Sequence, residues 1–277
     1  MAKKKKGTKG KHSQFRDTFA EHKPVGAYEG GGCLTGHQSA WKENDSCSYR
    51  WQGIQNAKDK NAKVYNIKSE PDWHLDAIAN TFRWIPVKSI NAGRAGQIVQ
   101  RLKKGIKKGK LKQKIQAKNF TTGYTPYSNQ VHHVIPNNVL KEAILKATKK
   151  KADLVKDLVD GLLAAPYNIN YKVNMLILPS LDSVCCKLGL PKHLGSHPTY
   201  DKNLKDKVNE TVQMYTETAD DKEEHDPDFG KIADELVAIS EDLYDSVVDY
   251  GQSKIKAQCA VGTVNTLPKR VFNVLNG

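Results

Sequence analysis

The fold of this 277-residue chain is decided by residues 127–136, YSNQVHHVIP, where His132 and His133 stand side by side in a short apolar segment. The pattern predicts that both histidines lie at the end of a β-strand. A second apolar segment, residues 173–179 with the sequence VNMLILP, ends in proline and predicts a buried strand that returns toward the first. Asn174 opens this returning strand.

A second pair of histidines occurs in residues 190–200, LPKHLGSHPTY. Proline is tolerated in the first turn of a helix, so Pro198 predicts a helix over residues 198–216 with His193 and His197 just before it. The order strand, strand, helix is expected to present imidazoles from both sides of one cleft.

Imidazoles in this arrangement favour metal chemistry. Neutral histidine is a common ligand of transition metals, and a metal with few protein ligands keeps positions open for phosphate oxygens. A further histidine that stays off the metal titrates near neutrality and can deprotonate a water molecule. Backbone N–H groups at the helix start near His197 are expected to favour a phosphodiester. Taken singly, each pair is also compatible with surface or core histidines without a function.

The ordered set HHVIPNN, NMLILPS and LPKHLGSHPTY resembles the AHH-type branch of the HNH/endonuclease VII nucleases, within the His-Me finger superfamily. The likeness covers residues 124–203, and Val131 stands where the family pattern has alanine. It implies an α+β fold with a ββα-metal (His-Me finger) nuclease core and flanking helices. This branch is common among bacterial polymorphic toxins and secreted effectors.

The resemblance also implies roles for individual residues. His133 resembles the general base, and Asn174 resembles the residue that fixes the loop holding it. One divalent ion (Mg, Mn, Ni or Zn) is implied, and DNA is the first and RNA the second expected substrate. The site residues that follow are catalytic His133 and Asn174, metal-binding His132, His197 and His193, and substrate-binding Lys187, Lys192 and Ser196.

The net formal charge of +14 is unevenly distributed. Residues 1–120 contain 26 Lys and Arg against 9 Asp and Glu, whereas residues 200–277 contain 9 against 16. Such a basic excess suits a polyanionic partner. The asymmetry predicts separate modules: a basic disordered tail (1–23), a small loop-rich N-terminal domain of unknown fold for delivery or binding (24–100), a basic linker (101–120), and a nuclease domain (121–277). The linker is compatible with a solvated spacer or with an arm that follows phosphates.

Two more helices are predicted from apolar residues at three- and four-residue steps. One covers residues 138–165, with Asn137 or Asn138 as its cap and Pro166 as its end. The other lies within residues 228–258.

The chain has no apolar run of the roughly 20 residues that a membrane span requires, and its charged start leads us to expect no secretory signal peptide. We therefore expect no membrane insertion, synthesis in a bacterial cytoplasm, reduced thiols, and delivery into a target cell by an export apparatus such as type VI secretion. A cognate immunity protein is the expected partner in the producing cell. Cys33, His37 and Cys47, with His22, are candidate zinc ligands, but their spacing matches no standard finger and favours ordinary buried thiols.

Three alternatives stay open from the sequence. The first is a metal-dependent RNase on the same finger, and the second is a non-catalytic basic nucleic-acid-binding protein with a structural zinc. The third is an inactive adaptor of a secretion apparatus.

Overall fold

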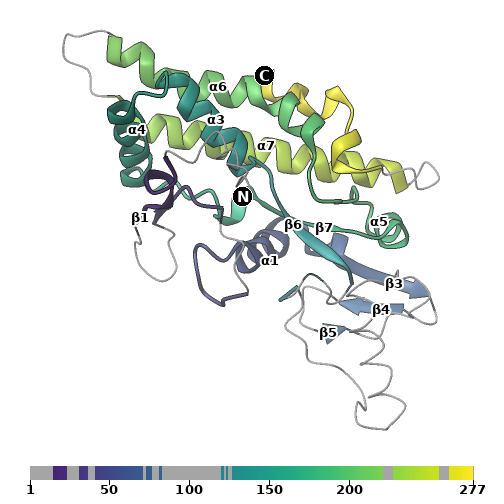
Figure 1. Ribbon diagram of the computed structural model, residues 1–277. Helices are drawn as coiled ribbons and strands as arrows, with labels where there is room; N and C mark the ends of the chain where they lie inside the picture. Colours follow the sequence, from purple (N-terminus) through teal and green to yellow (C-terminus); the bar gives the residue numbers. More distant parts are fainter. Residues whose placement is uncertain are drawn as a thin grey trace, which may run out of the picture.

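The computed structural model describes residues 15–23, 31–36, 41–70, 73–76, 81–82, 120–121, 123, 127–220, 227–255 and 262–276. Helices predominate around small antiparallel sheets, which fits an α+β nuclease (Figure 1). The strands are β1 (His22–Lys23), β2 (Gly32–Cys33), β3 (Asn66–Glu70), β4 (Trp73–Asp76), β5 (Thr81–Phe82), β6 (Asn129–His133) and β7 (Met175–Pro179). The α-helices are α1 (Tyr49–Lys60), α3 (Asn137–Ala147), α4 (Ala152–Ala164), α5 (Asp182–Leu188), α6 (Pro198–Asp220) and α7 (Phe229–Ile255). Short 3-10 helices include η5 (Lys172–Asn174), η6 (Val264–Thr266) and η7 (Lys269–Asn276).

The two-stranded sheet of β6 and β7 is the centre of the molecule. The strands pair antiparallel, with His132 opposite Leu176 and His133 opposite Met175. All five residues of β7 are buried, as expected for a strand that is apolar throughout. The predictions of a strand ending in the two histidines and of a returning buried strand are therefore confirmed.

Helix α1 packs closely against this sheet. A Cβ atom at Gly53 would lie 3.2 Å from side-chain carbons of both Val131 and Ile177, so glycine permits the close approach. Asn56 Nδ2 donates to Met175 O at 3.2 Å, and Tyr65 Oη donates to Ile177 O at 2.7 Å. These side chains satisfy backbone carbonyls that a two-stranded sheet leaves without a partner strand.

The segment after β6 forms two helices, so the prediction of one helix over residues 138–165 is wrong. Helix α3 ends at Ala147, and both Lys149 and Lys150 have positive φ, which a continuous helix does not allow. The predicted caps also differ, because the residue at the N-cap of α3 is Pro136, whereas the Asn137 side chain donates to Leu34 O.

The helices predicted over residues 198–216 and within 228–258 are confirmed as α6 and α7. Helix α6 begins at Pro198, as expected. Residues 262–276, whose sequence predicts no particular element, pack on α6 and α7 through η6 and η7. One continuous apolar core extends from Phe15 to Leu275.

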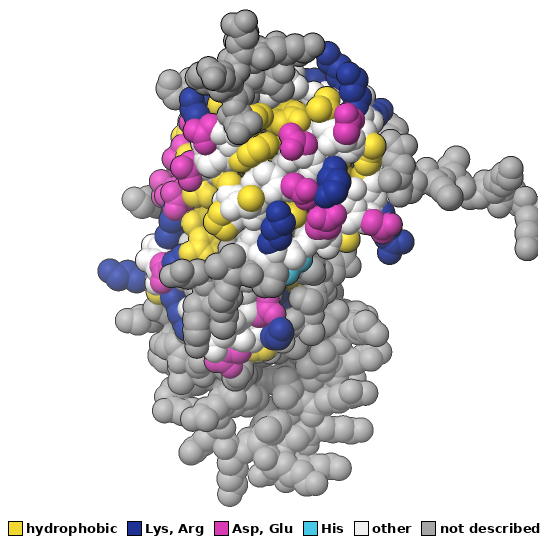
Figure 2. All heavy atoms as spheres, turned by 90° about the vertical axis from the view of Figure 1, so that its left-hand side faces the viewer, with side chains coloured by type: hydrophobic (Ala, Val, Ile, Leu, Met, Phe, Trp, Pro, Cys, Tyr) yellow, Lys and Arg dark blue, Asp and Glu magenta, His cyan; other side chains and the backbone are white. Residues whose placement is uncertain are grey.

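The remaining properties of the fold concern a cysteine, the hydropathy of the helices and the surface charge. Cys186 is disulfide-bonded, so the expectation of reduced thiols is wrong at this position. No helix among the described residues is long and apolar enough to cross a bilayer. On the face in Figure 2, basic and acidic side chains are interspersed over the described residues, and neither sign dominates. The basic excess of the linker at 101–120 falls almost entirely outside the described residues.

Candidate metal centre

Three histidines from two distant segments meet beside the end of β6. One ring nitrogen each of His132, His193 and His197 lies within 4.8 Å of the other two. The ring centroids are 4.7 Å apart for His132 and His197, 5.2 Å for His132 and His193, and 5.3 Å for His193 and His197. Three imidazoles around one point form a ligand set suited to a divalent transition metal.

The burial of the ring nitrogens and their hydrogen bonding are consistent with a metal site. His132 is 1% exposed, and neither of its ring nitrogens has a hydrogen-bond partner among the described residues. Nε2 of His193 is also buried and has no partner in the part of the chain that the structure describes. A buried polar atom without a partner costs about 1 to 3 kcal/mol, so the arrangement is unfavourable unless something binds these atoms. The ligand set therefore fits the metal that the sequence resemblance implies.

Burial keeps the imidazoles of His132 and His193 neutral. Burial holds the pKa of His132 well below its ordinary value, and the neighbouring His193 and His197 lower it further. Burial lowers the pKa of His193 to about 4, with added repulsion from His197 and His133. Neutral rings expose the lone pairs that a metal requires.

Asp201 orients the third histidine. His197 Nδ1 lies 2.8 Å from Asp201 Oδ1, one helical turn along α6, and Asn138 Nδ2 donates to Asp201 Oδ2 at 3.0 Å. Burial raises the pKa of Asp201, but the hydrogen bonds from His197 and Asn138 lower it more. The ionised carboxylate holds the proton on Nδ1, so Nε2 of His197 presents its lone pair.

His133 lies on the opposite face of β6 from His132, as strand alternation requires. Its Nε2 is 3.0 Å from Asn170 Oδ1, and its ring centroid is 6.1 Å from that of Tyr49. Asn170 Nδ2 donates to Thr35 O at 2.8 Å, which identifies Oδ1 as the atom facing His133. An amide oxygen only accepts, so Nε2 carries the proton and Nδ1 of His133 is the basic nitrogen. Burial lowers the pKa of His133, and the Asn170 hydrogen bond partly offsets this.

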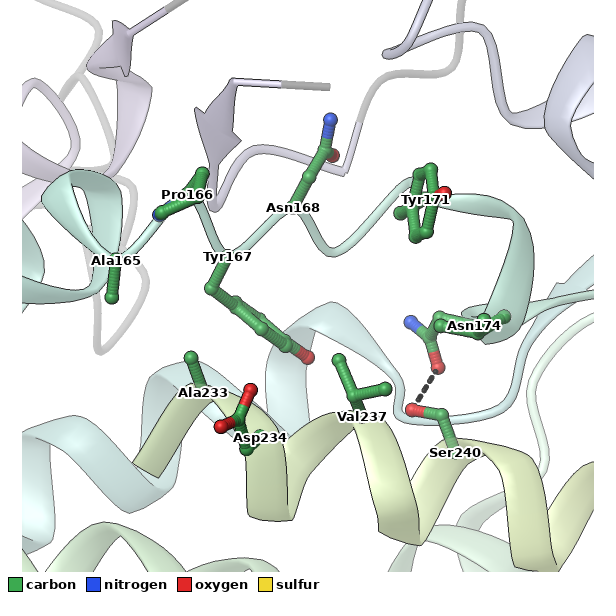
Figure 3. A pocket seen from close by; sticks show the side chains of 11 residues that line it. Ala165, Pro166, Tyr167, Asn168, Tyr171, Asn174, Ala233, Asp234, Val237 and Ser240 are labelled. Atoms are coloured by element: carbon green, nitrogen blue, oxygen red, sulfur yellow. Dashed lines mark hydrogen bonds between the residues drawn. The ribbon is translucent and has the colours of Figure 1, made fainter. Parts of the chain in front are cut away.

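Asn174 holds the chain that leaves His133. Its Oδ1 accepts from Ile135 N at 2.6 Å, and its Nδ2 donates to Ile135 O at 3.1 Å and Ile169 O at 2.8 Å. Ser240 Oγ adds a donor at 3.2 Å from Asn174 Oδ1. Figure 3 shows this last bond beside a cavity of about 330 Å³ between the 165–174 segment and α7. The ring of Tyr167 points into the space, which is separate from the three-histidine cluster and holds none of its residues.

The loop with His193 and His197 is anchored at both ends. His193 N donates to Pro179 O at 2.9 Å, and Lys192 exchanges backbone hydrogen bonds with Gly262 and Val264 at 2.9 Å each. Asn265 Oδ1 accepts from Thr199 N at 2.8 Å. Thus the C-terminal segment fixes the metal-binding loop.

This anchoring changes the expected anion site at the start of α6. Pro198 has no N–H, and the N–H of Thr199 already donates to Asn265. Two of the first helical positions are therefore unavailable, and the expectation of an open anion site there is wrong.

The three residues predicted to contact substrate lie in varied settings. Lys192 Nζ forms an ion pair with Asp182 Oδ2 at 3.0 Å. Lys187 is exposed in the last turn of α5, and Ser196 is exposed beside His197. None of them has a described contact with the three-histidine cluster.

The sequence analysis did not identify roles at the site for Asp201, Asn138 and Asn170. It also did not predict that residues 262–265 hold the metal-binding loop. Asp201 left a signal, because it follows His197 by four residues on a predicted helix. Asn170 and Asn265 left none, since their partners are far away in sequence.

Comparison with known proteins assigns this segment. No curated protein and no solved structure matches the chain. Residues 114–236 match a family described as a nuclease family of the HNH/ENDO VII superfamily with conserved AHH. The matched segment includes the three-histidine cluster and His133. It also includes Asn170, Asn174 and Asp201. Residues 114–236 of this chain are therefore identified with the AHH nuclease family of the HNH/ENDO VII superfamily.

Proposed function

We propose that this chain is a metal-dependent endonuclease that hydrolyses DNA, with His133 as general base and one divalent ion held by His132, His193 and His197. The single observation that carries the proposal is the convergence of three imidazoles, two buried and one partly buried, whose nitrogens lie within 4.8 Å of one another. The ββα-metal core corresponds in this proposal to β6, β7 and the start of α6.

His133 suits the role of base because its surroundings select one tautomer. Asn170 Oδ1 accepts a hydrogen bond from the protonated Nε2 of His133, so Nδ1 can accept a proton from water. The same oxygen stabilises the imidazolium that forms, since it faces a ring N–H in both protonation states. A bound divalent ion would supply positive charge for the phosphate oxygens and the departing 3′ oxygen.

Asn174 acts as a positioning residue in this proposal. Its bonds to Ile135 and Ile169 fix the backbone on both sides of the base, since Ile135 follows His133 by two residues and Ile169 precedes Asn170. Preorganised groups lower the barrier because they need not be ordered during the reaction.

The choice of substrate rests on charge and on family membership. A net charge of +14 suits a phosphodiester polymer. Lys187, Lys192 and Ser196 are the proposed backbone contacts, with Lys192 exchanging its Asp182 partner for phosphate. DNA is the first choice, and RNA is the alternative that the same chemistry allows.

The biological setting is likewise a proposal. Membership of the AHH family supports a role as an antibacterial toxin that is exported from the producing cell. A cognate immunity protein would then protect the producer, and a secretion apparatus would carry the chain out.

A plasmid-nicking assay tests the proposal. The purified chain is treated with EDTA and then supplied with Mg, Mn, Ni or Zn, beside His133→Ala and His197→Ala. Gln130→Ala is the matched control, because Gln130 is exposed on the same strand. We expect metal-dependent nicking by the wild type and the control, none by His133→Ala with metal still bound, and none by His197→Ala with metal binding weakened.

Absence of cleavage under every metal would overturn the DNase proposal. An RNA oligonucleotide and its 2′-deoxy counterpart then distinguish the alternatives. Cleavage of the RNA alone would assign an RNase, and tight metal binding without any cleavage would assign a binding protein.

A further inference from the structure

A second cluster of metal-ligand type lies on the other side of His133, outside the segment matched by the family. His22, Cys33 and Cys47 each offer one ligand atom, and these atoms lie within 4.8 Å of one another. Cys33 is fully buried and Cys47 is 8% exposed, whereas His22 lies at the surface. Neither cysteine takes part in a disulfide.

Three separate chain segments bring these residues together. His22 in β1 is directly opposite Cys33 in β2, so both side chains emerge on the same side of the pair. Cys47 arrives from the turn before α1, where Asp45 Oδ1 accepts from Cys47 N at 2.8 Å. Sequence spacing could not reveal this set, because the pairing of β1 and β2 creates it.

The distances match those of a tetrahedral zinc site. Zinc bonds of about 2.3 Å to sulfur and about 2.0 Å to nitrogen place a sulfur and a nitrogen ligand about 3.5 Å apart. Cys47 Sγ lies 3.4 Å from His22 Nδ1. The Sγ atoms of Cys33 and Cys47 lie within 4.8 Å of each other. Two thiolates also neutralise one Zn²⁺, which suits a buried position.

A shell of amides surrounds the sulfurs. Asn170 Nδ2 lies 3.6 Å from Cys33 Sγ, and Asn168 Nδ2 lies 3.6 Å from Cys47 Sγ. Hydrogen bonds to thiolates orient the ligands of a metal site. Cys33 also exchanges backbone hydrogen bonds of 2.9 Å with Tyr167 and Ile169. The cluster thus joins the N-terminal segment to the loop that carries Asn170, the partner of His133.

We propose that His22, Cys33 and Cys47 bind a structural zinc ion that fastens the N-terminal segment to the 167–170 loop. This site is independent of the proposed nuclease chemistry, since its ligands include sulfur and lie on separate segments. The three described ligands occupy three of four tetrahedral positions and leave one for water or another group.

Cobalt substitution tests the proposal without reference to activity. The full chain is purified under reducing conditions, stripped with a chelator and titrated with Co²⁺. Only a sulfur-containing site gives a thiolate-to-cobalt charge-transfer band in the near ultraviolet. We expect the band in the wild type, its saturation at one equivalent in His132→Ala, where the three-histidine site is impaired, and its loss in Cys47→Ser. Cys185→Ser is the matched control, because Cys185 is a buried thiol outside the cluster.

Two further measurements guard against variants that fail to fold. His22→Ala changes an exposed residue, and we expect it to lower zinc affinity at least about tenfold, the low end for loss of a group that only supports a ligand. A mercurial thiol reagent should release one zinc per wild-type chain. Absence of the cobalt band, an unchanged band in Cys47→Ser, or a Cys33–Cys47 disulfide in the reduced preparation would overturn the proposal.

Discussion

Replacing Asn174 with alanine should destabilise the protein and impair catalysis together, because this one side chain ties three segments. Asn174 is 2% exposed and makes hydrogen bonds to Ile135, Ile169 and Ser240. Alanine removes the acceptor of Ile135 N–H and the donors to the carbonyls of Ile135 and Ile169.

The size of the effect follows from these bonds. An N–H that is left buried without a partner costs about 1 to 3 kcal/mol, and each lost bond to a carbonyl adds about 1 kcal/mol. The total is about 3 to 5 kcal/mol, a large share of the roughly 5 to 15 kcal/mol that stabilises a typical domain. Ser240→Ala removes one hydroxyl, which faces Asn174 Oδ1 at 3.2 Å and Leu236 O, one turn earlier in α7, at 2.9 Å. This change should cost about 1 kcal/mol or less.

Urea unfolding of Asn174→Ala, Ser240→Ala and the wild type measures these differences directly. Nicking rates are compared at a temperature where all three are folded, with metal content determined in parallel. We expect kcat to fall in Asn174→Ala while the three-histidine site keeps its metal. Equal unfolding free energies for Asn174→Ala and Ser240→Ala would refute the reasoning, because the Ile135 bonds would then contribute nothing.

Three other predictions concern the site and its scaffold. Asp201→Asn should weaken metal binding at the three-histidine site about 10- to 100-fold, as measured by chelator competition. Asn170→Ala should lower kcat and change the pH profile of kcat. It should leave metal affinity at the three-histidine site unchanged, because the histidine that Asn170 contacts is His133. Gly251→Ala should cost about 1 to 3 kcal/mol in urea unfolding, because its Cβ would meet the backbone of Gly189, whereas Gly230→Ala near the start of α7 should be neutral or stabilising.

Local patterns in the sequence predicted the strands and helices that carry the histidines. The histidine strand, the apolar strand β7 and the Pro198 start of α6 each depend on residues that are neighbours along the chain. The break at Thr148 was missed, because the apolar spacing continues across it while the backbone of Lys149 and Lys150 turns away.

Long-range contacts set the limits of prediction for the site. Asn170 is separated in sequence from its partners His133 and Thr35 by 37 and 135 residues. No local sequence pattern could therefore predict its role. The His22, Cys33 and Cys47 cluster depends on the pairing of β1 with β2. Asp201 was within reach, since a carboxylate four residues after a candidate metal ligand on a helix is a recognisable signal.

The turn between α3 and α4 offers a place to alter the protein without disturbing its chemistry. The segment that connects β6 to β7 contains α3 and α4, and hydrogen bonds hold its two ends together. Asn174 Oδ1 accepts from Ile135 N, and Asn174 O accepts from Val134 N at 2.9 Å. Doubling the length of a flexible loop costs only about 0.6 kcal/mol. A tag or small domain inserted at the exposed Lys149–Lys150 turn should therefore be accepted without loss of the strand pairing or of the metal-binding loop.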